Sequence, residues 1–162
     1  MPGEESAGQA RNHPRMCGLA VQRCNREDSV MFMQFLAHLV GDFWLQNDWM
    51  ALNKKRPGRL GRLACALHCL TYTLPFLLLT RSWKALLVIM VTHYVIDRTN
   101  LIAWLVWAKN KVYAGGLDCT WAEAKVNGGF HPSRPIWLAI WLCIICDNTL
   151  HLILNALALK YL

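Results

Sequence analysis

The sequence predicts an all-α protein, a four-helix integral membrane bundle preceded by a disordered N-terminal arm. Hydrophobic residues make up 55% of the 162 residues and charged residues only 17%, which is too apolar for an ordinary soluble domain. Four long apolar segments follow one another, and several of the eight tryptophans fall near their ends, where amphipathic rings favour the membrane interface. An apolar segment satisfies its own backbone hydrogen bonds in lipid only as a helix, so each segment predicts one.

The elements follow in a simple order along the chain. Residues 1–28 are polar and charged without an apolar run, so we expect a disordered arm. The expected helices cover about 29–47, 63–80, 83–107 and 135–161. Because a helix needs about 20 residues to cross the hydrocarbon core, the first two are short for a span and the last two are long enough. A polar string from Asp97 to Asn100 interrupts the third.

Positive charge gathers in the connections between these segments. The first and third connections hold the following basic residues: Lys54, Lys55, Arg56, Arg59, Arg62, Lys109, Lys111, Lys125 and Arg134. We expect these side chains to contact anionic lipid headgroups, which accounts for the net charge of +7. The sequence contains no basic stripe with interleaved aromatic residues, so we expect no nucleic-acid partner.

Histidine and aspartate recur inside the apolar segments, where an ionisable group costs roughly 2.5 kcal/mol or more. These residues are His38, Asp42, His68, His93, Asp97, Asp147 and His151. Six of them form three pairs four residues apart, and on a helix such a pair shares one face. Every expected helix therefore carries at least one side chain that can bind a metal ion. The pair in the last helix begins about 18 Å along it, so its depth matches the others least well.

Imidazole and carboxylate together suit zinc first, with iron or manganese as alternatives. We expect the four histidines to be ligands, and Asp42, Asp97 and Asp147 to be ligands or a catalytic general base. Gln46 and Asn148 are expected to hydrogen-bond the substrate or the ligands. The set exceeds one tetrahedral shell, so it predicts either two ions or one ion with supporting carboxylates.

Two other interpretations of the same residues stay open, as does a contribution from cysteine. The pairs could form a buried hydrogen-bond network without metal, in which each aspartate orients the histidine one turn away. Intramembrane histidine and aspartate chains also occur in proton and ion pathways. Cys143 and Cys146 could add a thiolate ligand, although the seven cysteines do not follow zinc-ribbon spacing and are expected to be reduced, small and apolar.

Four ordered motifs carry a resemblance to a known family. They are Ala37-His38-Leu39-Val40-Gly41-Asp42-Phe43-Trp44-Leu45-Gln46 followed by Lys54-Lys55-Arg56, then His68, then Thr92-His93-Tyr94-Val95-Ile96-Asp97-Arg98, and finally Asp147-Asn148-Thr149-Leu150-His151. From about Met31 to Leu162 the chain resembles the domain of unknown function 3307 family, which implies a small multi-span membrane protein of a bacterium or phage. The family has no established activity to carry over.

The sequence thus predicts a metal-dependent hydrolase in a bacterial inner membrane, or in the host membrane if a phage encodes it, acting on a membrane-associated substrate. The competing prediction is a non-enzymatic membrane protein that binds a host membrane partner and uses the histidines and aspartates as a structural network.

Overall fold

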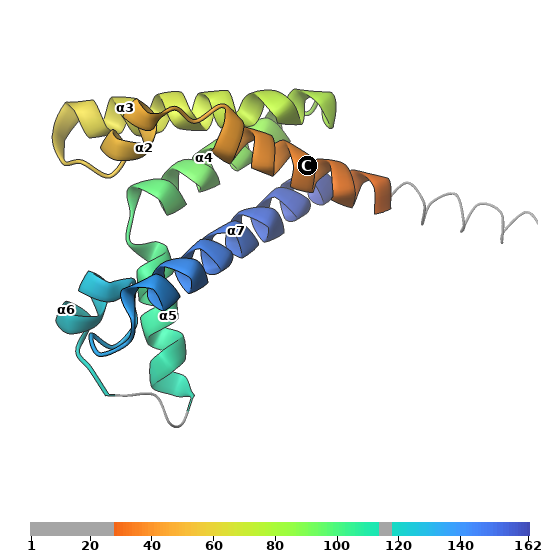
Figure 1. Ribbon diagram of the computed structural model, residues 1–162. Coiled ribbons are helices and arrows are strands. Elements are labelled where there is room, and N and C mark those ends of the chain that lie inside the picture. Colours follow the sequence, from red (N-terminus) through yellow and green to blue (C-terminus); the bar gives the residue numbers. More distant parts are fainter. Residues whose placement is uncertain (1–27, 114–117) are drawn as a thin grey trace, which may run out of the picture. The chain divides into compact units, whose positions relative to one another are not determined.

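The computed structural model describes residues 28–113 and 118–162, and every regular element in these ranges is a helix (Figure 1). This confirms the all-α expectation for the described part of the chain. The chain divides into two compact units, Met1–Met33 and Gln34–Leu162. In the first unit the structure describes residues 28–33, which are helical. The arm expected over residues 1–28 lies, apart from Asp28, outside the described residues.

The second unit contains all the elements that matter for the site. Its residues 34–39 are α-helical and lead into a π-helical turn, η1. The elements are η1 (Val40–Trp44), α2 (Asp48–Asn53), α3 (Gly58–Thr73), the 3₁₀ turn η2 (Leu74–Leu78), α4 (Trp83–Arg98), α5 (Leu101–Val112), α6 (Trp121–Ala124), the 3₁₀ turn η3 (Lys125–Asn127) and α7 (Ile136–Tyr161).

Side chains in two connections cap the start of the helix that follows. The Oδ1 of Asn47 accepts a hydrogen bond from the backbone N–H of Met50 at 2.9 Å and so caps α2. At the start of α6, Thr120 and Glu123 form a reciprocal capping box. The backbone N–H and hydroxyl of Thr120 donate to the Glu123 carboxylate and hold its pKa below the ordinary value.

Where one helix is expected over residues 83–107, the structure has two, α4 and α5, bent by 70° at their junction. The hydroxyl of Thr99 donates to the carbonyl of Val95 at 2.7 Å and accepts the backbone N–H of Leu101 at 3.3 Å. Thr99 itself is extended, with φ −108° and ψ 175°. A side chain that binds the backbone in this way competes with the helical hydrogen bonds, so the polar string ends α4.

Two helices are long and apolar enough to cross a membrane: Gly58–Leu78, which joins α3 to η2, and α7. The bent pair of α4 and α5 makes a third if it counts as one broken span. The described residues therefore contain two or three helices that could span a membrane, and the expected four-helix membrane bundle is not confirmed. The first expected helix, 29–47, differs most, because its helical part ends at Trp44 and the short helix α2 follows.

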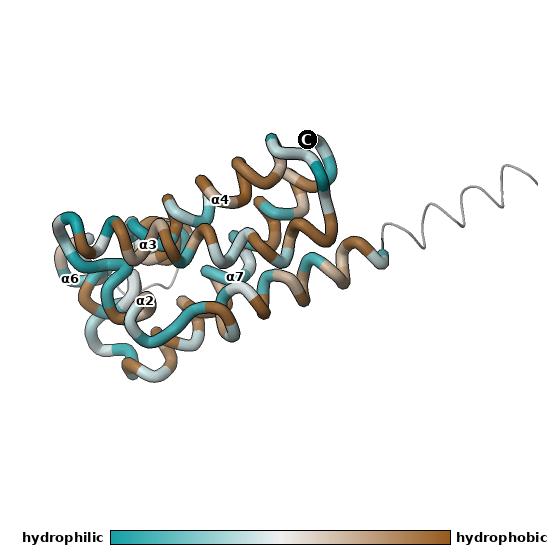
Figure 2. Tube along the Cα trace, turned by 90° about the horizontal axis from the view of Figure 1, so that it is seen from above, coloured by the Kyte–Doolittle hydropathy of each residue, from teal (hydrophilic) through white to brown (hydrophobic). Residues whose placement is uncertain are grey.

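The helices of the second unit pack around α4 and α7. Contacts join α3 to α4, α4 to α7, α2 to α3, and α5 to α7. Tyr72, Phe76 and Ile89 lie at the centre of one buried cluster, and Ile96 and Val106 belong to another. Figure 2 shows that hydrophobic residues recur along α4 and α7. The α7 helix exposes residues such as Ile140, Trp141 and Ile145, as a helix apolar on all sides does in lipid.

Candidate metal centre

Two buried histidines and two aspartates from three elements meet at the centre of the second unit. The π turn η1 supplies Asp42, α3 supplies His68, and α4 supplies both His93 and Asp97. The two imidazole Nε2 atoms are 2.9 Å apart. The Nε2 of His68 lies 3.2 Å from Asp42 Oδ1 and 3.1 Å from Asp97 Oδ2. The corresponding distances from His93 Nε2 are 3.3 Å and 3.4 Å.

Four of these five distances are close to the edge of a tetrahedral ligand shell, and the distance between the two Nε2 atoms is shorter. With metal–ligand bonds of about 2.0–2.1 Å, neighbouring ligand atoms of a tetrahedral zinc site lie about 3.3 Å apart. Each Nε2 carries at most one proton but lies beside two carboxylate oxygens. Hydrogen bonds from the two rings can therefore account for only two of the four short N–O distances. The ligand atoms of Asp42, His68 and His93 lie within 4.8 Å of one another and could hold a divalent cation, and Asp97 approaches the same two imidazole nitrogens.

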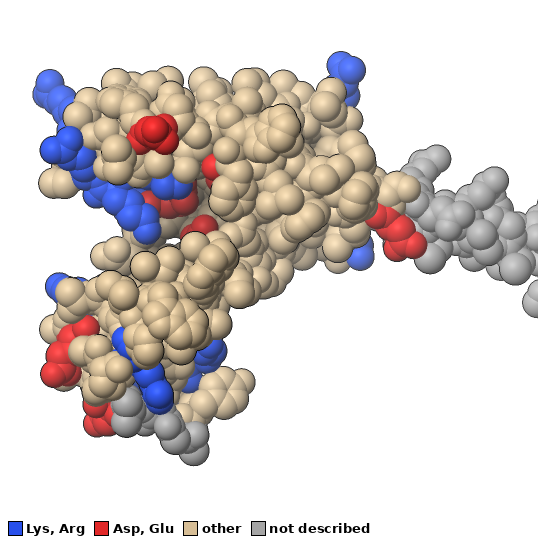
Figure 3. Space-filling view, viewed as in Figure 1, with Lys and Arg blue, Asp and Glu red and all other residues tan. Residues whose placement is uncertain are grey.

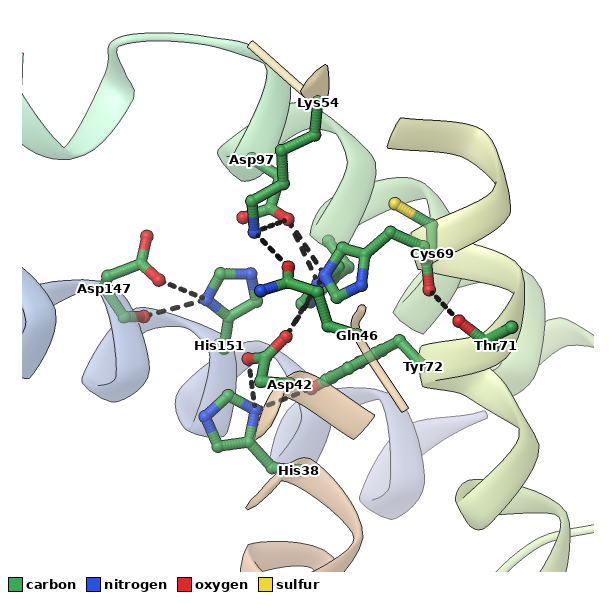
Figure 4. A network of polar contacts seen from close by, with 12 residues as sticks. His38, Asp42, Gln46, Lys54, Cys69, Thr71, Tyr72, Asp97, Asp147 and His151 are labelled. Carbon is green, nitrogen blue, oxygen red and sulfur yellow. Dashed lines mark hydrogen bonds and ion pairs between the residues drawn. The ribbon is translucent and has the colours of Figure 1, made fainter. Parts of the chain in front are cut away.

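His151 of α7 points a further nitrogen at this cluster. Its Nδ1 lies 2.9 Å from the backbone carbonyl oxygen of Asp147 and 3.6 Å from the carboxylate of the same residue (Figure 4). The opposite nitrogen, Nε2, is buried without a hydrogen-bond partner among the described residues. One ligand atom each of His151, His93 and Asp97 lie within 4.8 Å of one another, so these residues form a second possible ligand group. His151 thus lies beside the centre, although its position along the last helix predicted a different depth from the other ligands.

His38, expected as a ligand, belongs to neither group. Its Nε2 lies 2.7 Å from the Oδ1 of Asn148, which can only accept, so this nitrogen carries the proton and donates. Its Nδ1 then accepts the hydroxyl proton of Tyr72 at 2.9 Å, and the same hydroxyl oxygen accepts from the Nδ2 of Asn155 at 2.7 Å. These bonds tie residues 34–39, α3 and α7 together. With its Nδ1 also 3.4 Å from Asp42 Oδ2, His38 lies behind that ligand.

A lysine occupies the outer side of the centre. The ammonium of Lys54 donates to Asp97 Oδ2 at 2.7 Å and to Gln46 Oε1 at 2.8 Å (Figure 4). The sequence predicts that Lys54 contacts lipid headgroups, whereas in the structure it pairs with a carboxylate. Gln46 therefore supports the centre through Lys54, and a carboxylate oxygen has lone pairs for both an ammonium and a second partner.

The aromatic ring of Tyr72 packs directly against the cluster. It stacks on His93 with ring centroids 3.6 Å apart and planes 20° apart, which fixes the imidazole orientation. The Nδ1 atoms of His68 and His93 are buried and have no hydrogen-bond partner within the described ranges. A metal-bound histidine commonly donates its other ring N–H to a carboxylate or carbonyl oxygen. No described residue accepts such a bond from His68 or His93, and packing against Tyr72 orients the His93 ring instead.

A cleft of about 410 Å³ opens onto the centre. Its carboxylates are Asp42, Asp97 and Asp147, and acidic atoms are visible inside the hollow beneath basic ones (Figure 3). Asp147 belongs to neither ligand group, and its side chain is 35% exposed. Cys143 also lines the cleft, but its thiol donates to the carbonyl of Gly128, and neither ligand group includes a cysteine.

Sequence reasoning missed three residues of the site. Tyr72 lies four residues after His68 and Asn155 four residues after His151, so each continues a helical stripe that had already been identified. Neither side chain is an obvious metal ligand, so residue type alone does not mark either as part of the site. No comparable signal marks Lys54, because its partner Asp97 lies 43 residues away.

Comparison with known proteins identifies one family. The model of the family described as protein of unknown function (DUF3307) matches residues 30–117, more than half of the chain, and confirms the resemblance found in the sequence motifs. The match includes Asp42, Lys54, His68, His93 and Asp97, whereas α7 with His151 lies beyond it. No curated protein and no solved structure shows significant similarity to the chain.

Proposed function

The chain belongs to the DUF3307 family, and from the geometry of its polar centre we propose that it is a membrane protein that holds a divalent metal ion and hydrolyses a membrane-associated substrate. The observation that carries the proposal is the convergence of Asp42, His68 and His93, whose ligand atoms lie within 4.8 Å of one another, with Asp97 beside both imidazoles. The apolar spans support a membrane location. The localisation that we propose is a bacterial inner membrane, or the host membrane if a phage encodes the protein.

The proposed ion is zinc, with iron or manganese as alternatives for a set of two imidazoles and two carboxylates. A divalent ion in this position would supply Lewis-acid activation of water and of a substrate oxygen. Asp42 is both a proposed ligand and part of the cleft wall, with its side chain 15% exposed, so the centre is accessible from the cleft. His151, whose buried Nε2 has no hydrogen-bond partner in the described part of the chain, is a further possible ligand.

Asp147 is the residue that we propose as general base. Its carboxylate lines the same cleft without belonging to either ligand group, so it is available to take a proton from water. Asp42 and Asp97, the other two aspartates expected to be catalytic, serve here as ligands. Asn148 holds His38, and His38 in turn contacts Asp42, so both are positioning residues.

Elemental analysis of the purified protein in detergent tests the metal. We expect about one zinc, iron or manganese ion per chain, lost in His93→Ala and retained in the matched control His131→Ala, whose histidine bonds Ser133 away from the centre. Hydrolysis should require the ion and return when the chelated protein is reloaded. Folded wild-type protein that takes up no divalent ion would refute the proposal.

One observation favours a second candidate, a non-enzymatic membrane protein that binds a host membrane partner. The Lys54 ammonium already places a positive charge 2.7 Å from Asp97, so the cluster could be a metal-free network that holds the helices in register. Under this alternative, chelation leaves the stability of the protein unchanged, which separates the two functions.

A further inference from the structure

The rim of the cleft holds two lysines that the metal centre does not use. Lys55 follows Lys54 in the connection after α2. Lys125 begins η3, which is distant from Lys55 in sequence. Both side chains are exposed, and neither forms an ion pair within residues 28–113 and 118–162. Two elements distant in sequence thus line one cleft with lysines that have no ion-pair partner among the described residues, and the same cleft is lined by carboxylates. Figure 3 shows basic and acidic atoms close together at this hollow.

The charges of the cleft indicate the charge of its ligand. Its lining contains three lysines and three aspartates, so the side chains balance. A bound divalent cation then leaves a net charge of about two positive units on the cleft. Such a cleft favours an anion over a neutral ester, and a phosphomonoester carries about 1.5 to 2 negative charges at neutral pH.

Apolar side chains line the cleft beside these charges. Phe43 is 60% exposed and Ile144 is 40% exposed, and Ile102 and Ala103 also line the cleft. Phe43 belongs to η1 and Ile144 to α7, one of the two helices apolar enough to span a membrane. A ligand that occupies the whole cleft therefore needs an anionic group and an apolar group close together, as a membrane amphiphile has.

We propose that the cleft binds the phosphate-ester headgroup of a membrane amphiphile, with Lys55 and Lys125 contacting the phosphoryl oxygens and Phe43 and Ile144 contacting the apolar part. Lysine serves as a point charge for phosphate. This inference rests on the proposed function, because the bound cation provides the excess positive charge.

The corresponding reaction is hydrolysis of the phosphate ester. The oxygen of one water molecule forms a bond to phosphorus as the bond from phosphorus to the alcohol oxygen breaks. One proton of that water passes to the Asp147 carboxylate and from there to the departing alcohol oxygen. The reaction consumes water alone and needs no oxidant or reductant.

Binding to defined probes tests this inference separately from turnover. Zinc-loaded protein in a neutral detergent is titrated with phosphatidic acid, with diacylglycerol, which has the same tails without phosphate, and with glycerol 3-phosphate, which has the phosphate without tails. Bound phosphate is followed by phosphorus NMR and bound diacylglycerol by equilibrium partition. We expect phosphatidic acid to bind at least tenfold more tightly than either other probe.

The lysines are tested with a double variant and a control of equal charge. We expect Lys55→Ala with Lys125→Ala to weaken phosphatidic acid binding by roughly thirtyfold. Lys84→Ala with Lys160→Ala removes the same charge outside the cleft, beside Trp83 and Tyr161, and should change binding less than twofold.

The outcomes also separate this inference from the proposed function, because metal content is measured on the same samples. Zinc-loaded protein that binds diacylglycerol as well as phosphatidic acid, or that is indifferent to the cleft lysines, overturns the phosphate inference and leaves the metal site standing. Equal binding of glycerol 3-phosphate overturns the amphiphile part. Wild-type protein that takes up no zinc, iron or manganese overturns the proposed function.

Discussion

Asp97→Asn should remove the metal-dependent part of the protein's stability. The Oδ2 of Asp97 lies 2.7 Å from Lys54, 3.1 Å from His68 and 3.4 Å from His93, so one carboxylate serves an ammonium and two proposed ligands. The side chain is only 6% exposed and that of Lys54 is 18% exposed. Removing one member of such a buried pair typically costs about 3–5 kcal/mol. We expect the lower end, about 3 kcal/mol, because Gln46 still accepts from Lys54.

The metal adds a second, separable effect. An ion that binds only the folded protein stabilises it by about 2.7 kcal/mol when its free concentration is one hundred times its dissociation constant. Chemical unfolding in detergent, with chelator and with buffered zinc, should therefore show this increment in the wild type and little of it in Asp97→Asn. Asp118→Asn, which alters an exposed carboxylate paired with Lys111, is the matched control and should keep the full increment. Wild-type unfolding curves that are identical with chelator and with zinc, iron or manganese would contradict the proposed metal site.

Three further substitutions test the surroundings of the centre. Tyr72→Phe removes the hydroxyl that bridges His38 and Asn155, so we expect a loss of about 1–3 kcal/mol in the free energy of unfolding with metal content retained; loss of the metal as well would mean that the tyrosine does more than orient rings. Gly41→Ala places a Cβ 2.5 Å from Tyr72 Cδ2 and 3.1 Å from the backbone oxygen of Tyr72. Chemical denaturation should therefore show a loss of about 1–3 kcal/mol in the free energy of unfolding. Wild-type stability would mean that η1 shifts to accommodate the methyl group at little cost. Asp147→Asn should keep the metal and slow hydrolysis by about 10²- to 10⁴-fold, and full activity would exclude it as the general base.

Much of the centre could be predicted because helical spacing is a local property. His93 and Asp97 share a face of α4 whatever packs against it, and the pairs in the apolar segments marked the buried polar side chains in advance. Composition alone also favoured an all-helical, membrane-embedded protein. These predictions required no knowledge of how the helices pack.

Sequence alone therefore determined which side chains are costly to bury and which of them share a helix face. Tertiary packing decided which of those side chains meet. His38 and His68 have the same residue type and similar burial, yet His38 hydrogen-bonds Tyr72 and Asn148 while His68 approaches both carboxylates. The interruption after Asp97 became a 70° bend, and Lys54 reached across 43 residues to that aspartate. Helical periodicity specifies neighbours only within one helix, so contacts between helices depend on the packing of the whole unit.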